Sequence, residues 1–527
     1  MAARRERHGV DVMAGRRGIR AVAPLRDLRL VLLGAAAWAG GLAGPAVPGH
    51  RLVVLGLGGV LVTLVVVAVR LPPHRATALA AAMVLAGAAG VAALEADRVA
   101  HNPVAELAGR GVAATVVGTV SDDPRPVVEQ HGTGELVRLG VRTVTGQGTT
   151  YRLRAPVLVL GDERWADVPL GSTVRARGEL SPADDASGML FAGGAPEVLA
   201  PPGPWWRASS VVRAAIRGAV AGRPLTQRAL VPALVDGDVT EVPRDVSADF
   251  KTTGLTHLLA VSGTNLTLVV GFLLVVARWC RVRGRGLYAV GALGIAGFVL
   301  LARTEPSVLR AAVMGAIGLV AMGHDGRHRG LRGLGGATVG LLLVDPGLAR
   351  SAGFALSVLA TAGILLLGPP WRDALSRWLP RWLAEAIAVP AAAQLACTPV
   401  IAVISGKVSL VAVVANLLAE PAVGPATVLG LLGGLLHLLW APLGPLAGVP
   451  AAWSVSWIVA VAHRCARLPT AQVGWGSGPV AIGLLVLLTV AIGLHGPRLL
   501  RHRVLGPASC LLLVAVTAIR LPTPGWW

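Results

Sequence analysis

The chain has 527 residues; 54% of them are hydrophobic and only 14% are charged, and the mean hydropathy is +0.66. This composition excludes an ordinary soluble protein, and repeated apolar runs long enough to cross a bilayer indicate a polytopic membrane protein. The net charge of +20 does not indicate nucleic-acid binding, because arginine-rich cytoplasmic loops alone produce such an excess in a multi-pass protein. The four cysteines include no CxxC pair, so neither a disulfide framework nor a zinc site is expected.

The N-terminal part of the chain is expected to form a basic tail and three membrane spans. Residues 1–27 are rich in arginine and predict a cytoplasmic tail. Residues 28–97 contain three apolar runs, at about 28–46, 50–69 and 76–94. Arg70 and Arg75 mark the loop after the second run as cytoplasmic, so the third run leads outward.

Residues 98–200 are expected to form a small extracytoplasmic β domain. Apolar residues alternate between turn residues, which predicts five strands at 115–120, 136–144, 150–160, 173–180 and 189–199. Five short strands in such a length suggest a small barrel. The segment holds ten Arg against twelve Asp and Glu, and only three aromatic residues, so it is a poor platform for stacking bases. Weak contact with DNA and a purely structural role both remain open.

Residues 201–250 predict an amphipathic helix followed by a polar entry loop. Trp205 and Trp206 open a segment in which arginines alternate with apolar residues, as in helices that lie in the membrane interface. A buried helix whose arginines reach outward is the alternative. The carboxylates of the polar run 236–251 lack the spacing of an EF-hand, so no metal site is expected there.

The stretch 254–271, GLTHLLAVSGTNLTLVVG, opens a membrane domain that we expect to span residues 251–527. It is apolar enough to cross a bilayer, yet it carries polar side chains and a Ser-Gly break. Polar groups in hydrocarbon cost about 1–3 kcal/mol or more when unsatisfied, so they usually face a bundle interior or a watery path. A helix-packing seam and a transport path both remain open. The polar residues are His257, Ser262, Asn265 and Thr267, and the break lies at Ser262-Gly263.

The rest of this domain predicts nine further spans, which gives about thirteen in total. They lie at about 286–302, 307–323, 331–344, 351–369, 383–404, 421–440, 447–463, 478–496 and 505–521. Residues 409–420 are too short to cross before Pro421, so they predict a re-entrant half-helix of the kind that transporters place at a substrate path, with Asn416 in it. Basic loops then place the N-terminus inside the cell and the C-terminus outside.

Arg310 lies about one turn into the span at 307–323, close to Ser307. A charge at mid-helix costs roughly 2.5–3.5 kcal/mol to insert, so it needs a partner or a wet path. An ion pair with Glu305 or Asp345 would simply hold helices together. Alternatively, Arg310 contacts phosphates near the outer mouth, helped by the positive N-terminus of its helix.

Four motifs occur in the order in which the ComEC competence family has them, and together they resemble that family. They are GLTHLLAVSG at 254–263, ARTEPSVLRAAVM at 302–314, VDPGLARSAGFALSVLATAG at 344–363, and the region from Asn416 to AEPAVGP. The resemblance covers roughly residues 30 to 520. One departure is that family members commonly have a histidine where Asn265 stands.

The resemblance implies a polytopic α-helical membrane protein with an inserted OB-like β domain outside the cell membrane. It implies a channel that carries single-stranded DNA inward during natural transformation. The candidate path residues are His257, Ser262, Gly263, Asn265, Ser307, Arg310 and Asn416. Residues that match family motifs and are expected to shape the helices are Gly237, Asp238, Gly254, Asp345, Pro346, Gly353, Phe354, Ser357 and Pro421.

The implied partners are the lipid bilayer, an extracellular DNA receptor, a separate cytoplasmic ATPase or DNA-binding protein, and possibly a separate nuclease. A transporter or flippase of another anionic substrate, or a degenerate member without transport, remains an alternative. The oligomeric state is left open.

No enzymatic activity and no cofactor are expected. SGKV at 405–408 lacks the upstream glycine and the following Ser or Thr of a phosphate-binding loop. Many members of the resembled family continue into a metallo-β-lactamase-like domain, but no HxHxDH motif occurs here and the sequence stops at TPGWW (523–527). Nuclease activity is therefore not expected of this chain.

Overall fold

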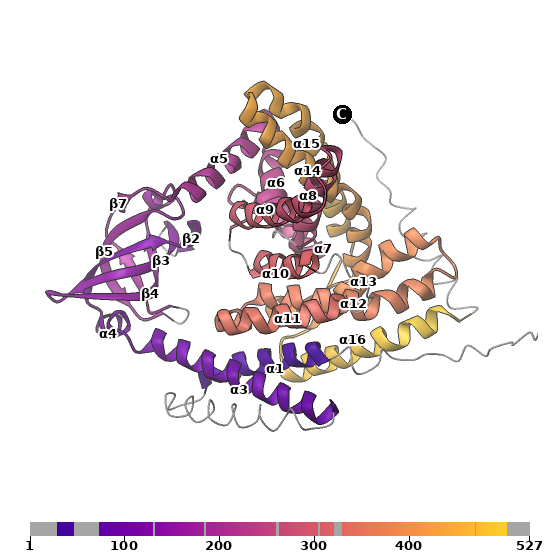
Figure 1. The fold of residues 1–527 in the computed structure, drawn as a ribbon, viewed down its shortest axis with the longest axis horizontal. Helices are drawn as coiled ribbons and strands as arrows, with labels where there is room; N and C mark the ends of the chain where they lie inside the picture. The colour runs from indigo at the N-terminus through magenta and orange to yellow at the C-terminus, as the bar shows by residue number, and fades with distance from the viewer. Residues whose placement is uncertain are drawn as a thin grey trace, which may run out of the picture.

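The computed structural model describes residues 29–46, 73–129, 132–183, 186–259, 263–303, 306–320, 329–469 and 471–502. The predicted tail and the predicted spans at about 50–69 and 505–521 lie outside these residues. The described part comprises an N-terminal helix pair, a β domain at one end of the molecule, and a helical body (Figure 1).

The β domain follows the short helix α4 and contains seven strands among the described residues. The elements are α4 (Pro103–Gly109), β1 (Ala113–Val120), β2 (Arg125–Glu129), β3 (Gly132–Gly146), β4 (Thr149–Gly161), β5 (Thr173–Ser181), β6 (Gly188–Ala192) and β7 (Glu197–Ala200). Five strands are paired in the order β1-β3-β4-β6-β5, and β1 also pairs with β5, which closes the sheet into a ring. Within this ring β4 and β6 run parallel and the other pairs antiparallel.

The core of the β domain follows from the alternation in its sequence. Every second residue of β1 is buried, and inward-facing valines and leucines of the other strands meet it. Trp165 is completely buried and its Nε1 donates to the carbonyl oxygen of Gly194 at 3.0 Å. Two details differ from the prediction. The short strand β2 was not predicted, and the run at 189–199 forms two strands because the chain turns at Gly193-Gly194 between them.

Helix α1 (Arg29–Ala43) packs against α3 (Pro73–Ala100), which leads into the β domain, and α5 (Pro204–Ala219) leads out of it (Figure 1). The helical body continues with α6 (Leu225–Asp236), α7 (Arg244–Thr253), α8 (Gly263–Trp279), α9 (Arg285–Leu301), α10 (Pro306–Val320), α11 (Arg329–Val344), α12 (Ala352–Leu375), α13 (Arg381–Ser405), α14 (Ala412–Leu439), α15 (Gly444–Ala466) and α16 (Pro479–Leu500). Short elements between them are η3 (Thr256–Leu258), η4 (Pro346–Arg350), β8 (Lys407–Ser409), η5 (Ala441–Leu443) and β9 (Gln472–Gly474).

In the described part of the chain, seven helical segments are long and apolar enough to cross a membrane, and four shorter apolar helices accompany them. The seven are Arg29–Ala46, Thr77–Ala100, Ala352–Leu375, Arg381–Ser405, Ala412–Leu439, Ala441–Ala466 and Pro479–Leu500. The chain is thus a mostly helical, multi-pass membrane protein with a β domain.

One predicted element differs in the structure. Residues 409–420 do not form a separate half-helix, because α14 runs continuously from Ala412 to Leu439 through Pro421 and Pro425. A proline removes one backbone donor, but a long helix held by neighbouring helices keeps its remaining hydrogen bonds. Helix α5 has one face that packs against α14, α15 and α6 and another that exposes Trp205 and Val211, so it is amphipathic as predicted, and its place in the membrane interface stays a prediction.

Candidate functional site

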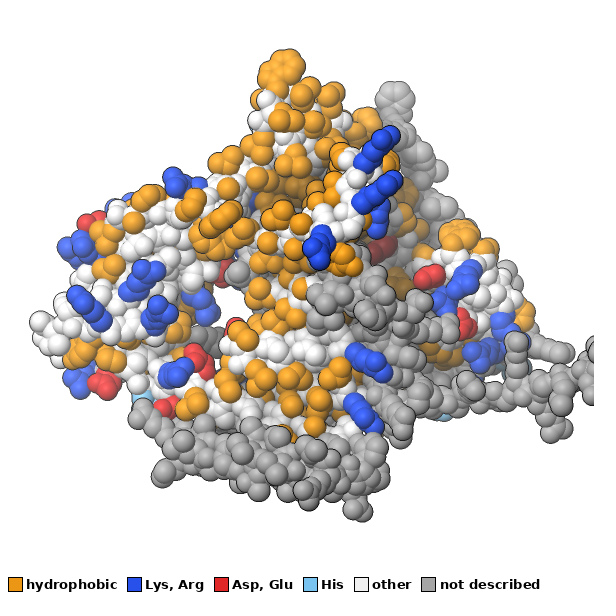
Figure 2. All heavy atoms as spheres, in the orientation of Figure 1, with side chains coloured by type: hydrophobic (Ala, Val, Ile, Leu, Met, Phe, Trp, Pro, Cys, Tyr) orange, Lys and Arg blue, Asp and Glu red, His pale blue; other side chains and the backbone are white. Residues whose placement is uncertain are grey.

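A cavity of about 2280 Å³ lies in the helical body and extends to the β domain. It exceeds the roughly 300–1,000 Å³ of a typical small-molecule pocket. Figure 2 shows that the surface is hollowed between the β domain and the helices beside it. The wall is formed mainly by α8, α10, α12, α13 and α14, with the β1–β2 loop near the β domain and β8 also contributing.

The described residues of the motif at 254–263, which are 254–259 and Gly263, contribute non-helical backbone and the start of α8 to this wall. Gly254 ends α7 with φ +70°, in the left-handed region, and a Cβ at this position would lie 2.8 Å from the Cβ of Ala412. One turn of 3-10 helix follows, and α8 begins only at Gly263. Non-helical backbone at membrane depth is tolerated where it lines a cavity, and Gly254, His257 and Gly263 all do so.

His257 is exposed to the cavity, and its Nδ1 lies 3.1 Å from the carbonyl oxygen of Gly254. Because a carbonyl oxygen only accepts, Nδ1 carries the proton, and Nε2 is the nitrogen available to other groups. Asn265, in contrast, is buried and donates from Nδ2 to the carbonyl oxygen of Leu234 at 2.9 Å. It ties α8 to α6 and is not among the cavity-lining residues. Ser262 lies outside the described residues.

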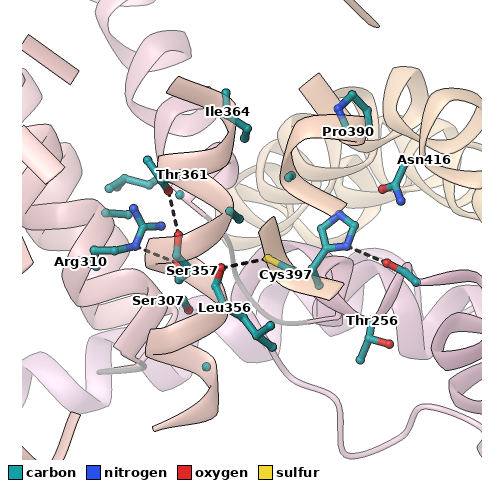
Figure 3. Close-up of a pocket in the computed structure, with 18 of the residues that line it drawn as sticks. Thr256, Ser307, Arg310, Leu356, Ser357, Thr361, Ile364, Pro390, Cys397 and Asn416 are labelled. Atoms are coloured by element: carbon teal, nitrogen blue, oxygen red, sulfur yellow. Dashed lines mark hydrogen bonds between the residues drawn. The ribbon is translucent and has the colours of Figure 1, made fainter. Parts of the chain in front are cut away.

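Arg310 reaches the cavity from α10 and is only 6% exposed. Its Nε donates to Oγ of Ser357 on α12 at 2.8 Å (Figure 3). Its Nη1 lies 3.2 Å from Sδ of Met314. Ser307 lies one turn before Arg310 and also lines the cavity. Asp345, one suggested ion-pair partner, instead accepts from the backbone N–H of Gly347 at 3.0 Å and caps η4. Glu305, the other, lies outside the described residues.

The motif around Gly353 serves both the cavity and the packing. Gly353 and Ser357 line the cavity, whereas Phe354 is completely buried and meets Trp38 of α1 edge to face, with ring centroids 5.6 Å apart. Pro346 is buried in η4. Phe354 therefore packs α12 against α1, while Gly353 and Ser357 face the cavity.

On the opposite wall, Asn416 is 7% exposed and donates from Nδ2 to the carbonyl oxygen of Ala412 at 2.8 Å. Pro421 also lines the cavity, one turn further along α14. Two carboxylates in this wall, Glu385 and Glu420, were not singled out from the sequence. Glu420 stands in the AEP motif beside Pro421, which could have drawn attention to it.

A partly buried ionic cluster joins the β domain to the helical body beside the cavity. We call it the junction cluster; it consists of Asp123, Arg213, Arg217, Asp236, Asp238 and Arg303. Arg303 Nε lies 3.0 Å from Asp123 Oδ2 in the β1–β2 loop, and Arg213 Nη1 lies 3.4 Å from Asp236 Oδ1. Arg217 Nη1 lies 2.6 Å from Asp238 Oδ2. The cluster explains the Gly237-Asp238 motif, because Gly237 ends α6 with φ +81° and turns Asp238 back toward α5.

The two carboxylates beside Gly237 differ in their proton affinity. Burial raises the pKa of Asp236 to about 7, although the positive charge of Arg213 acts in the opposite direction. Burial also acts to raise the pKa of Asp238, but a hydrogen bond from Thr240 and the charges of Arg213 and Arg217 lower it overall. From the sequence only Asp238 was singled out, through the Gly237-Asp238 motif, and the cluster as a whole could not be predicted because its members come from four separate segments.

A multi-pass helical body with a large cavity, whose mostly apolar wall carries several polar side chains, and with an inserted β domain defines a polytopic membrane protein. The chain belongs to the competence protein family, since the family model described as Competence protein matches residues 234–499, just over half of it. The ComEC-type assignment made from the motifs is thereby confirmed.

A curated relative is ComE operon protein 3 of Bacillus subtilis (strain 168), which is 27% identical over 216 residues. The match covers 41% of this chain but only 27% of that protein, so the chain matches about a quarter of its relative's length. No solved structure matches the chain significantly.

Proposed function

We propose that this protein is a cell-membrane channel that carries single-stranded DNA into the cytoplasm during natural transformation. The observation that carries the proposal is the cavity of about 2280 Å³ within helices that are otherwise apolar. Polar side chains at membrane depth are costly unless they face water or a substrate, and here they converge on one space from several helices. Membership of the competence family supports DNA as the substrate.

The charge of the cavity wall suits a polyanion. Six basic residues line it, against three acidic ones. The basic residues are Arg125, Arg138, Lys251, Arg303, Arg310 and Lys407, and the acidic ones are Asp122, Glu385 and Glu420. An excess of positive charge in a low-dielectric cleft raises the local concentration of an anionic substrate. Within this wall we assign path contacts to His257, Gly263, Ser307, Arg310 and Asn416, together with Ser262.

The β domain is proposed to be an OB-like barrel outside the membrane that guides the strand to the cavity. Its closed ring of five strands, with β4 and β6 parallel, supports this. Arg125 and Arg138 extend from it to the cavity, and Arg142 and Arg154 line a smaller pocket of about 410 Å³ on its surface. Since aromatic residues are scarce, the contacts are to the phosphate backbone rather than by base stacking.

The wider arrangement follows the sequence analysis. We propose about thirteen spans, a cytoplasmic N-terminus and an extracytoplasmic C-terminus. A receptor delivers DNA outside, a separate ATPase or DNA-binding protein draws it inward, and any nuclease is a separate protein. The chain itself acts as a conduit rather than as an enzyme.

Uptake of labelled DNA by cells with and without the gene tests the proposal. Thr361→Trp places a large side chain on the cavity wall of α12 and is expected to abolish uptake. Leu484→Trp is the matched control, because Leu484 lies on the exposed face of α16, 58% exposed, and should leave uptake unchanged. Equal uptake with and without the gene would refute the proposed function. If cells without the gene instead lose transport of another anion, the result would favour a transporter or flippase of that anion.

A further inference from the structure

Arg310 combines near-complete burial with a charge that pairs with no carboxylate among the described residues. Its two side-chain partners, Ser357 Oγ and Met314 Sδ, are both neutral. Within the described residues the guanidinium takes part in no ion pair, although its side chain lies in the wall of the cavity. Burying a cation is costly when no nearby charge balances it, and none of the described residues balances Arg310, which favours a role beyond the packing of helices.

The direction in which Arg310 points adds a second observation. Its Nε and Nη1 are engaged, which leaves Nη2 facing the start of α8: a Cβ built on Gly263 would lie 3.4 Å from that nitrogen. The first turn of this 17-residue helix presents backbone N–H groups and the positive end of the helix dipole. Two positive groups thus lie close together beside Gly263, which has no side chain, and this favours an anion that contacts both of them from the cavity.

We propose that Arg310 and the N-terminus of α8 form a binding site for a single phosphate group in the cavity wall. The guanidinium supplies the charge and the N–H groups of Nη2, Ser357 fixes its orientation, and the backbone of α8 supplies further donors. The site deepens the proposed function and rests on it in assigning the phosphate to a DNA strand. The phosphate of a lipid headgroup has the same chemistry, and the experiment below separates the two sources.

The test is thermal unfolding of the purified full chain in detergent, with inorganic phosphate added at constant ionic strength. A ligand that binds only the folded state raises the unfolding temperature, and the shift grows with the logarithm of its concentration. Wild type should show this shift, Arg310→Lys a smaller one, and Arg310→Gln none. Lys keeps the charge but not the planar fork.

The matched control is Arg350→Gln, which removes the same charge from an exposed position outside the cavity and should keep the full shift. Without phosphate, Arg310→Gln should unfold no earlier than wild type, because it relieves a buried charge. An equal phosphate shift in Arg310→Gln and wild type would overturn the site. The site would also be overturned if Arg310→Gln kept the phosphate-dependent rise in unfolding temperature while Arg350→Gln lost it.

Two further arms identify the source of the phosphate. Protection of wild type but not Arg310→Gln by a short oligothymidylate assigns it to a nucleic-acid strand. In phosphatidylcholine nanodiscs, wild type and Arg310→Gln can also be compared with and without added phosphatidylglycerol. If wild type is protected relative to Arg310→Gln only when phosphatidylglycerol is present, the phosphate belongs to a lipid headgroup. A phosphate shift in a protein that takes up no DNA would keep the site and refute the channel. Uptake without any Arg310-dependent shift would refute the site and keep the channel.

Discussion

Among single residues, His257 has a hydrogen-bond geometry that allows its roles to be separated. Nδ1 holds the turn at Gly254, while Nε2 is available to the cavity. Asparagine can place a donor near the position of Nδ1, whereas glutamine can place its amide near that of Nε2. One side chain therefore serves both the backbone that shapes the wall and the path itself, and the two substitutions separate these contributions.

We predict that His257→Ala loses uptake of labelled DNA at near-normal protein abundance, and that His257→Gln retains part of it. His257→Asn should keep abundance normal but lose most of the uptake. Quantitative uptake normalised to the protein level in membranes measures all three. If Asn restores uptake and Gln does not, the histidine serves to hold the turn rather than to contact the strand.

At the scale of elements, the junction cluster couples the β domain to α5, α6 and the α9–α10 loop. Its carboxylate Asp236 is fully buried, and its raised pKa means that the folded protein holds a proton there that the unfolded chain releases. Between the ordinary value of 3.8 and about 7 the folded state binds more protons than the unfolded state. Stability from this group is therefore present at low pH and is lost as pH rises through that window.

Asp236→Asn should remove this pH dependence, because the amide is neutral throughout and can still accept from Arg213. We predict that wild type loses stability relative to Asp236→Asn between pH 5 and 7, by up to a few kcal/mol, with little further change above. Thermal unfolding of both proteins across this range measures it. Asp238 does not interfere, because its lowered pKa places its own effect below this window. Parallel curves for the two proteins would contradict the prediction.

The close packing of α11 against α1 depends on one of two neighbouring glycines in α11. A Cβ at Gly335 of α11 would overlap the carbonyl oxygen of Leu30 in α1, whereas a Cβ at Gly336 would meet nothing within 4 Å. Both substitutions by alanine gain about 1 kcal/mol of helix propensity. We predict that Gly335→Ala nevertheless destabilises by roughly 1–3 kcal/mol through overpacking, while Gly336→Ala is neutral or stabilising. Unfolding temperatures compare the two, and equal values would contradict the α1–α11 contact.

The strands of the β domain could be predicted because alternation and turn residues act locally. The helix end at Gly254 could also be predicted, since a glycine there interrupts an apolar run, whereas the predicted break at Ser262-Gly263 adjoins residues outside the described part. The prediction of a half-helix at 409–420 was wrong because neighbouring helices hold α14 together across Pro421. Asn265 could not be placed from the sequence, because its partner Leu234 belongs to another helix. Long-range packing decides such positions.

For the whole molecule, the proposed orientation places the β domain outside the cell and the loop after α8 inside. Gly148 and Gly284 have φ of +79° and +55°, so cysteines there would be strained. Thr149→Cys and Arg283→Cys, on a cysteine-free background, are exposed neighbours that avoid this strain. We predict that a membrane-impermeant maleimide labels position 149 in intact cells and position 283 only after lysis. Labelling of position 283 in intact cells, and of position 149 only after lysis, would show that the orientation is the opposite of the one proposed.

The central claim is that DNA passes through the cavity. The most direct measurement is photo-cross-linking during uptake, with a photoreactive amino acid at Ile364 on the cavity wall or at Leu487 on the outer face of α16. In cells supplied with labelled DNA, the account predicts that a labelled single strand is cross-linked at position 364 and not at position 487. Uptake at the normal rate, with no cross-link at position 364 or with equal cross-linking at both positions, would contradict it.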